Sequence, residues 1–162
     1  MSIVTIAYIG LGSNLDNPVN QVRSALGELS GLPETRRVAQ SGLYRSAPLG
    51  PADQPDYVNA VAALQTTLSA EFLLDALQAI ELRHHRERAQ HWGPRTLDLD
   101  LLLFGDSVIQ SDRLTVPHPE LANRRFVLQP LFEIAPASVV PGLGKLTDLL
   151  AVCPDMALLN AV

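Results

Sequence analysis

The stretch Ser46-Ala47-Pro48-Leu49-Gly50-Pro51-Ala52-Asp53-Gln54-Pro55-Asp56 separates two segments, residues 36–45 and 57–67, that are both typical of β-strands. Three prolines and one glycine make this stretch a loop, because proline removes a helical hydrogen bond and glycine favours turns. A doubly wound parallel sheet needs a crossover helix between successive strands, and none fits here. The loop therefore favours an antiparallel sheet.

Two other segments predict amphipathic helices. The first follows a cap at Asp16 or Asn17, and its apolar residues recur at helical spacing, at Val19, Val22, Leu26 and Leu29. The second, residues 70–86, follows a cap at Ser69, and its apolar stripe consists of Leu73, Leu77 and Ile80. Away from that stripe the same helix carries two polar residues, Gln78 and Glu81.

Segments 3–9 and 97–104 predict two further strands, and a turn after the second leads toward a short partner strand, residues 107–110. Residues 124–134 are typical of a helix that Pro130 interrupts. The resulting order is β, α, β, β, α, β with a short extra strand and C-terminal helical segments. This order predicts an α+β fold, a ferredoxin-like βαββαβ layered sandwich with an antiparallel sheet.

Length and composition indicate a single domain over residues 1–162, because 162 residues with 47% apolar side chains fill one core but not two. The lone Cys153 can form neither an internal disulfide nor a zinc site by itself. No apolar run reaches the roughly 20 residues of a membrane span, and the N-terminal segment lacks a basic signal-peptide start. We therefore expect a cytoplasmic protein without a membrane partner. We also expect a monomer, although these observations do not address the oligomeric state.

Positive charge is concentrated in one part of an acidic chain. The formal charge is −5, which argues against a nucleic-acid partner bound through its phosphates. Residues 83–125 nevertheless hold seven of the twelve basic residues and all four histidines. Such a concentration suggests a focused anion site, although a solvated charged face is the commoner explanation.

The most informative segment is Trp92-Gly93-Pro94-Arg95-Thr96-Leu97-Asp98-Leu99-Asp100. In a strand, Asp98 and Asp100 lie on one face with α-carbons about 6.6 Å apart, close enough to share one or two hard cations such as Mg²⁺. The alternative is the wet face of an amphipathic strand. Arg95, directly after the turn, favours function, because Mg²⁺ and arginine together suit phosphoryl transfer.

Polar residues on both sides of this segment could bind phosphate. Upstream, a basic stretch consists of Arg83, Arg86, Arg88 and His91, which could close over a polyphosphate or form an exposed helix end. Downstream lie Arg113, Thr115, His118 and Arg124. A histidine in such a place is more often structural than a ligand contact. No dinucleotide fingerprint or P-loop is present.

A flat heterocycle could bind beside a strand. Tyr57 and Asn59 lie two apart and share a face, so a ring could stack on Tyr57 while the amide of Asn59 reads its polar edge. Phe126 could supply a second face, although core packing is its ordinary explanation.

Three motifs in order make the chain resemble 6-hydroxymethyl-7,8-dihydropterin pyrophosphokinases. They are Tyr8-Ile9-Gly10-Leu11-Gly12-Ser13-Asn14-Leu15, Tyr44-Arg45-Ser46-Ala47-Pro48-Leu49-Gly50-Pro51 with Gln54-Pro55-Asp56-Tyr57-Val58-Asn59, and the Trp92-to-Asp100 segment. The resemblance spans nearly the whole chain. It implies the ferredoxin-like fold, ATP as co-substrate, a pterin alcohol as acceptor, AMP as product and a role in folate biosynthesis.

The resemblance also implies roles for individual residues. Two Mg²⁺ ions would bind to Asp98 and Asp100, and charge would be stabilised by Arg86 and Arg95. The pterin pocket would comprise Ser46, Leu49, Tyr57, Asn59, Trp92 and Phe126. The nucleotide side would comprise Gln78, Glu81, Arg88, Trp92, Arg95, Leu101, Arg113, Thr115, His118 and Arg124.

The chain departs from the family's pattern at three positions. His91 stands where arginine is common, His85 where glycine is usual, and Ala47 where proline is common. A neutral His91 would lose a charge-assisted phosphate contact, and His85 would stiffen the loop. Two other functions remain open. One is single-phosphoryl transfer to another heterocyclic alcohol, and the other is a non-catalytic pterin- or nucleotide-binding module.

Overall fold

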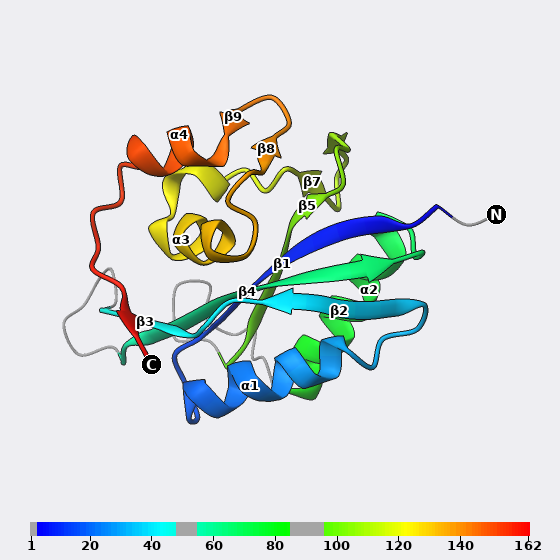
Figure 1. Cartoon of the computed structure of the whole chain (residues 1–162). Helices are drawn as coiled ribbons and strands as arrows, with labels where there is room; N and C mark the ends of the chain where they lie inside the picture. The colour runs from blue at the N-terminus through cyan, green and yellow to red at the C-terminus, as the bar shows by residue number, and fades with distance from the viewer. Residues whose placement is uncertain (1–2, 48–54, 85–95) are drawn as a thin grey trace.

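A computed structural model describes residues 3–47, 55–84 and 96–162 of the chain, and Figure 1 shows its arrangement. The first half contains β1 (Thr5–Ser13), α1 (Pro18–Leu29), β2 (Thr35–Gln40), β3 (Tyr44–Ser46), β4 (Tyr57–Thr66) and α2 (Ala70–Arg83). The second half contains β5 (Asp98–Phe104), β6 (Ile109–Gln110), β7 (Thr115–Val116), the 3₁₀ turn η1 (Leu121–Asn123), α3 (Arg125–Ile134), β8 (Val139–Val140), β9 (Gly144–Lys145), α4 (Leu146–Ala151) and β10 (Asn160–Ala161).

The main sheet is antiparallel in every pairing that joins its strands. Its order is β10-β3-β4-β1-β5, and β2 also pairs with β4. The central pair, β1 with β4, is in register from Thr5 opposite Thr66 to Ser13 opposite Val58. The predicted α+β fold with an antiparallel sheet is therefore confirmed. The β3–β4 pairing also confirms that the proline-rich loop joins antiparallel strands.

One face of the sheet packs on α1 and α2, which Figure 1 shows on the same side. The helix α2 begins as predicted, since the Ser69 hydroxyl accepts a hydrogen bond from the Phe72 amide at 3.2 Å. Its stripe of Leu73, Leu77 and Ile80 is fully buried against alternate residues of the strands. This face is a continuous apolar core, which supplies most of the burial that holds the sheet and these helices together.

The other face packs on α3, and α4 packs on α3 in turn, as Figure 1 shows. Here the apolar cluster joins the strand residues Val61 and Leu102 to three residues of α3, Val127, Leu128 and Leu131. Pro130 lies inside α3 and does not interrupt it, contrary to the prediction. Burial of this apolar face outweighs the single helical hydrogen bond that proline removes.

The predicted strand over residues 36–45 is two strands. Between them Ser41 places its hydroxyl where it accepts a hydrogen bond from the Val61 amide at 2.9 Å, so a side chain replaces a backbone carbonyl. The short strand after residue 104 is also different from its prediction. β6 pairs with β7 and not with β5, because the outer edge of β5 is occupied by other partners, including the His118 amide on Leu102 O at 3.0 Å.

Two further local details differ from the sequence expectation. Asn17 precedes α1 in a left-handed conformation with φ 65°, and its side chain makes no cap hydrogen bond. The strand β10, which pairs with β3, was not predicted. Within the described residues, no helix has both the length and the apolar character needed to cross a membrane.

Candidate active site

The two aspartates of β5 lie on the same face of the strand, as predicted. Asp98 and Asp100 are both half-buried, whereas Leu99 and Leu101 between and after them are 5% and 3% exposed and belong to the α1/α2 core. The alternation places both carboxylates at the same end of the sheet, on the side of α3. The core on the opposite face fixes the strand and thereby the spacing of the carboxylates.

The sheet register aligns the heterocycle candidates with the aspartates. Gly12 pairs with Asn59 on one side and with Asp98 on the other, so these residues form one row on one face. Adjacent strands are about 4.8 Å apart, which places the backbones of Asn59 and Asp98 about 10 Å from each other. Tyr57 is two residues from Asn59 and pairs with Ser46, so both continue the same surface.

Glycine at position 12 is required by this row. A Cβ at Gly12 would lie 2.7 Å from Nδ2 of Asn59, a separation that real Cβ atoms do not show. Asn59 is 7% exposed, and its Nδ2 donates to Leu11 O at 3.4 Å. Sequence reasoning assigned this glycine no role beside Asn59, whereas it lies inside β1. Gly12 lies opposite Asn59 on the neighbouring strand β4, and only the sheet register shows this proximity.

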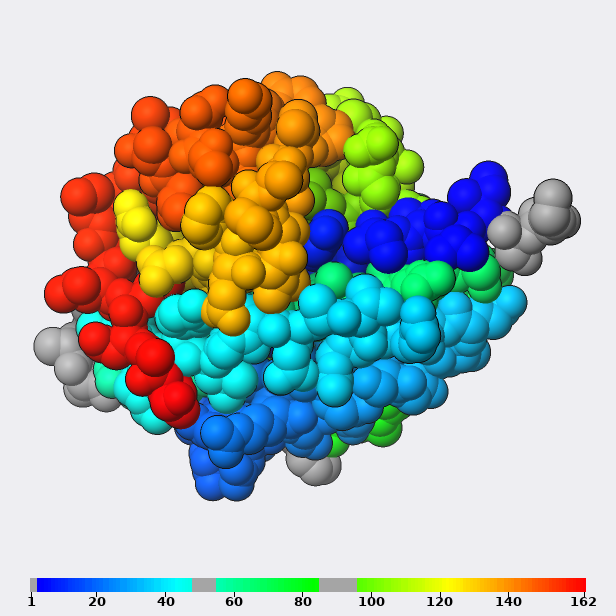
Figure 2. All heavy atoms as spheres, viewed as in Figure 1, coloured from blue at the N-terminus to red at the C-terminus, as the bar shows by residue number. Residues whose placement is uncertain are grey.

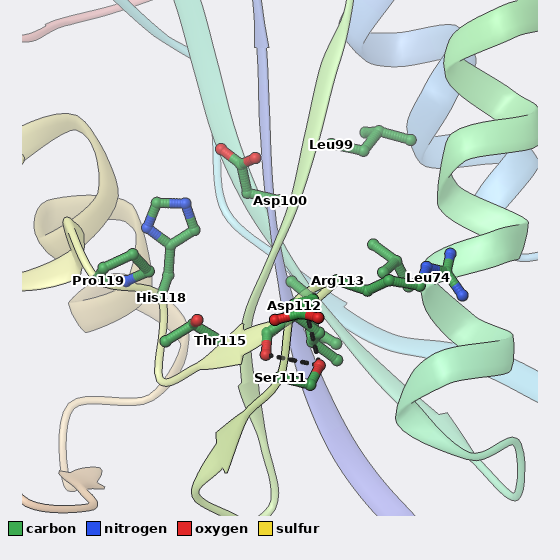
Figure 3. A pocket seen from close by; sticks show the side chains of 11 residues that line it. Leu74, Leu99, Asp100, Ser111, Asp112, Arg113, Thr115, His118 and Pro119 are labelled. Carbon is green, nitrogen blue, oxygen red and sulfur yellow. Dashed lines mark hydrogen bonds between the residues drawn. The ribbon is translucent and has the colours of Figure 1, made fainter.

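A pocket of about 270 Å³ lies along the outer edge of β5. Figure 3 shows Asp100 extending toward His118 and Leu99 extending to the opposite side. The lining residues come from α2, β5 and the segment around β7, and they are Leu74, Leu99, Asp100, Leu101, Ser111, Asp112, Arg113, Leu114, Thr115, His118 and Pro119. One of the two aspartates, Asp100, thus shares a pocket with four of the predicted nucleotide contacts, Leu101, Arg113, Thr115 and His118.

His118 faces this pocket as a neutral ring. Burial lowers the pKa of His118 below its usual value, and the nearby Arg124 acts in the same direction, while Asp100 and Glu120 oppose the shift. Its Nδ1 accepts a hydrogen bond from the Glu120 amide at 3.1 Å. The remaining ring nitrogen, Nε2, is then the one that carries a proton and can donate to a ligand.

Glu81 is buried, although the sequence placed it away from the apolar stripe of its helix. It is 7% exposed, and its Oε2 accepts a hydrogen bond from the Leu99 amide at 2.9 Å. This bond holds the backbone of β5 between the two aspartates. The Leu99 amide points away from β1, toward the outer edge of the sheet. Because amides two residues apart in a strand point the same way, the Leu101 amide also points to this edge, toward the pocket.

Arg113 lies on the α2 side of the pocket. Its guanidinium donates to Asp75 at 2.6 Å and to Glu71 at 3.1 Å, and it reaches Gln78 at 3.5 Å. These contacts join two of the predicted nucleotide residues, Arg113 and Gln78. The Arg113 side chain is 47% exposed, so part of it remains accessible to a ligand.

The start of α3 holds two further predicted site residues, Arg124 and Phe126. Arg124 lies over the ring of Phe126, with its guanidinium carbon 5.7 Å from the ring centroid. Phe126 is half-buried and packs against the core cluster under α3. Phe126 therefore does pack in the core, and its partly exposed ring could also contact a bound heterocycle.

Several predicted site residues fall outside the part of the chain that the structure describes. They are Leu49, Arg86, Arg88, His91, Trp92 and Arg95, together with the departure at His85. Their roles stay predictions. Among the described residues, no group of three or more histidine, cysteine or acidic side chains is placed to hold a metal ion.

Comparison with known proteins gives a consistent result. Residues 8–136 match the model of the family described as 7,8-dihydro-6-hydroxymethylpterin-pyrophosphokinase. A 2-amino-4-hydroxy-6-hydroxymethyldihydropteridine pyrophosphokinase from Pseudomonas aeruginosa is 56% identical over 147 residues, 91% of each chain. The protein of the same name from Haemophilus influenzae is 54% identical over 143 residues, which cover 88% of this chain and 89% of that one.

Solved structures support the fold. Plasmodium falciparum HPPK-DHPS, wild type with pteroate, superposes on 93% of this chain with a TM-score of 0.73 at 14% sequence identity. The wild-type protein with pterin and p-hydroxybenzoate gives a TM-score of 0.71 at 14% identity. This chain spans less than half of those longer chains, 42% and 43% respectively. At this identity the likeness shows the fold alone.

Proposed function

Because the chain belongs to the 7,8-dihydro-6-hydroxymethylpterin-pyrophosphokinase family and is a pyrophosphokinase of folate biosynthesis, we propose that it transfers diphosphate at the Asp98–Asp100 end of its sheet. The donor is ATP and the acceptor is the hydroxymethyl group of 6-hydroxymethyl-7,8-dihydropterin. The single observation that supports this placement is the row Asn59-Gly12-Asp98, which sets a buried amide beside a carboxylate on one face. The row places the Asn59 amide, which would bind the heterocycle, near the Asp98 carboxylate, which would bind a cation.

The residues fit magnesium. Asp98 and Asp100 are half-buried oxygen donors at a strand end, and Mg²⁺ is commonly held by one or two carboxylates plus water and substrate phosphates. We propose two ions, bound by these two side chains. Such ions neutralise the developing charge on the phosphates when they are bound. The aspartates themselves would hold and orient the ions, and neither carboxylate is required to accept or donate a proton.

The pterin side is assigned to the row and its neighbours. Asn59 presents an amide that is fixed by Leu11 and by the absence of a side chain at Gly12. Tyr57 and Phe126 offer rings on two walls, since Tyr57 begins β4 and Phe126 lies in the first turn of α3. The proposed pocket is completed by Ser46 of β3 and by two residues that the structure does not describe, Leu49 and Trp92.

The nucleotide side is assigned to the edge pocket. The outward amide of Leu101 and the Nε2–H of His118 are directional donors, and Thr115 adds a hydroxyl. Glu81 acts here by fixing β5 through the Leu99 amide. Charge and hydrogen bonds would come from Gln78, Arg113 and Arg124, and from Arg86, Arg88, Trp92 and Arg95 of the part not described.

The reaction is a direct displacement. The hydroxymethyl oxygen attacks the β-phosphorus of ATP, and the bond from that phosphorus to the oxygen that bridges it to the α-phosphate breaks. AMP leaves, and the hydroxyl proton is released to solvent. The chain's contribution is to place the two substrates in line and to surround the transferred group with positive charge. No covalent bond to a side chain is needed.

Three finer features complete the proposal. The order β5-β1-β4-β2 with α1 and α2 on one face supports the ferredoxin-like layout. A monomer is supported by the location of the proposed site residues in one chain. A cytoplasmic location is supported by the family's role in folate biosynthesis.

The test is identification of products. The protein is incubated with ATP, Mg²⁺ and 6-hydroxymethyl-7,8-dihydropterin, and the mixture is analysed by mass spectrometry. AMP and a pterin diphosphate in equal amounts support the proposal. ADP with a pterin monophosphate would mean single-phosphoryl transfer instead. Tight binding of both substrates by calorimetry with no product would mean a binding module.

A further inference from the structure

The C-terminal segment, residues 155–162, lies outside the part of the chain that the family model matches, which ends at residue 136. It leaves α4, passes the start of α3 and ends beside β3, as the red end of the chain in Figure 1 shows. In Figure 2 the same segment lies on the surface between α3 and the β3 end of the sheet. It therefore contacts two separate parts of the fold, the start of α3 and the strand β3.

The first contact is made by Asp155 at the beginning of α3. Its Oδ2 accepts a hydrogen bond from the amide of Arg125, the first residue of the helix, at 3.1 Å. The backbone oxygen of Asp155 accepts from Nε of Arg125 at 3.0 Å, and its Oδ1 accepts from the Ala157 amide at 2.9 Å. Arg124, at the N-cap position, makes no side-chain cap bond, so a distant residue caps this helix.

The second contact is the strand β10. It pairs with β3 through Asn160 opposite Arg45 and Ala161 opposite Tyr44, and the Val162 amide donates to Leu43 O at 3.0 Å. β3 has only three residues, and without β10 its one neighbouring strand would be β4. A strand this short at a sheet edge gains order when a second strand covers it.

Each contact adjoins a residue of the proposed pterin pocket. Arg125 immediately precedes Phe126, and Arg45 immediately precedes Ser46. We propose that residues 155–162 form a clamp that sets the separation of these two pocket walls, with Asp155 as a positioning residue for pterin binding. This inference rests on the proposed function. It assigns to the C-terminal segment a part in substrate affinity that the matched family region does not include.

The fold does not depend on the clamp alone. Glu133 of α3 also joins the two walls, because it accepts hydrogen bonds from the Tyr44 hydroxyl and, at 3.0 Å through Oε2, from the Gly42 amide. Removal of the Asp155 carboxylate should therefore leave α3 attached to β3 while its first turn becomes less ordered. We therefore expect Asp155→Ala to change the affinity for the pterin more than the free energy of unfolding.

The experiment compares the Michaelis constants of both substrates in three variants of the full enzyme. Asp155→Ala should raise KM for the pterin about fivefold to tenfold, the usual effect of losing a helix cap expressed as affinity. Asp155→Asn keeps one acceptor oxygen and should recover part of that loss. A chain that ends at Leu159 lacks β10 and should raise KM for the pterin while KM for ATP stays unchanged.

The matched control is Asp148→Ala, which removes an exposed carboxylate of α4 that makes none of these contacts. It should leave both Michaelis constants unchanged. A pterin KM equal to that of the parent enzyme in Asp155→Ala and in the shortened chain, even with a lower melting temperature, would mean a merely structural segment and overturn the proposal. An equal rise in both Michaelis constants in the shortened chain would also overturn it. Inactivity of the parent enzyme would instead refute the proposed function.

Discussion

The two faces of the central strands differ in chemistry although they alternate along the same residues. Toward α1 and α2, β5 presents Leu99 and Leu101, each at most 5% exposed. Toward α3, the same strand presents Asp98 and Asp100, both half-buried. The strands β1 and β4 repeat the contrast, with apolar residues on the first face and Gly12 and Asn59 on the second.

This difference shows that one face of the sheet stabilises the fold by packing, whereas the other face carries the residues of the proposed site. Burial of the first face supplies the free energy that holds the strands in register. The register then determines which residues meet on the second face, where two acidic side chains and a buried amide would gain little from packing alone. Substitutions on the two faces should therefore affect different measurements.

The largest effect is expected at the carboxylates. Asp98→Ala or Asp100→Ala should lower kcat/KM about a thousandfold, since a catalytic cation contributes several kcal/mol to the transition state. The free energy of unfolding should change by less than about 1 kcal/mol. Steady-state rates and urea unfolding measure the two quantities. Asp106→Ala, an exposed carboxylate just past the other end of β5, is the control, and near-parent activity in both active-site variants would contradict the assignment.

The opposite pattern is expected on the apolar face. Leu77→Ala removes a fully buried side chain of α2 and should lower the free energy of unfolding by about 2–5 kcal/mol. The rate of the folded fraction should remain within about twofold of the parent rate. Phe72→Ala on the same helix, where the side chain is 67% exposed, should change neither. A large loss of rate at full folding in Leu77→Ala would show that the two faces are not separate.

A smaller effect distinguishes two glycines of β1. Gly12→Ala should displace the amide of Asn59, which would lie 2.7 Å from the new Cβ, and raise KM for the pterin about tenfold. Gly10→Ala meets Leu102 only at 3.4 Å, an ordinary contact, and should have a much smaller effect. Equal Michaelis constants in the two variants would mean that Asn59 does not read the substrate.

The smallest effect concerns the tie between β3 and α3. Burial and the hydrogen bond to Glu133 raise the pKa of Tyr44 to about 12. Because the folded-state pKa is raised, this tie contributes to stability below about pH 10, the unfolded value, and the contribution is lost as pH rises toward 12. Ultraviolet titration should show a tyrosine that ionises late, and Tyr44→Phe should remove that step. A late step that survives in Tyr44→Phe would contradict the assignment.

Sequence reasoning predicted the parts of the fold that depend on periodicity. The stripe of α2, its Ser69 cap and the alternation of β5 follow from local spacing, and all three are confirmed. Sequence reasoning failed where contacts with residues distant in the sequence determine the local structure. Ser41 divides the predicted strand because its hydroxyl takes the Val61 amide, and Pro130 stays inside α3 because the helix packs on the sheet.

The same division applies to the site. The sequence placed Asp98 and Asp100 on one face because both lie on one strand. It gave Gly12 no role beside Asn59 and Asp155 no role at α3, since these contacts join residues 47 and 30 positions apart. It also placed Glu81 on the helix surface, whereas an interaction with the edge of β5 buries it.

The most direct test of the central claim is a count of bound divalent ions. Manganese binding is measured by electron paramagnetic resonance in the presence of a non-hydrolysable ATP analogue and the pterin, for the parent enzyme and for Asp98→Asn and Asp100→Asn. We expect two ions per chain in the parent enzyme and the loss of at least one in each variant. Unchanged stoichiometry and affinity in both variants would show that the paired aspartates do not hold the cations.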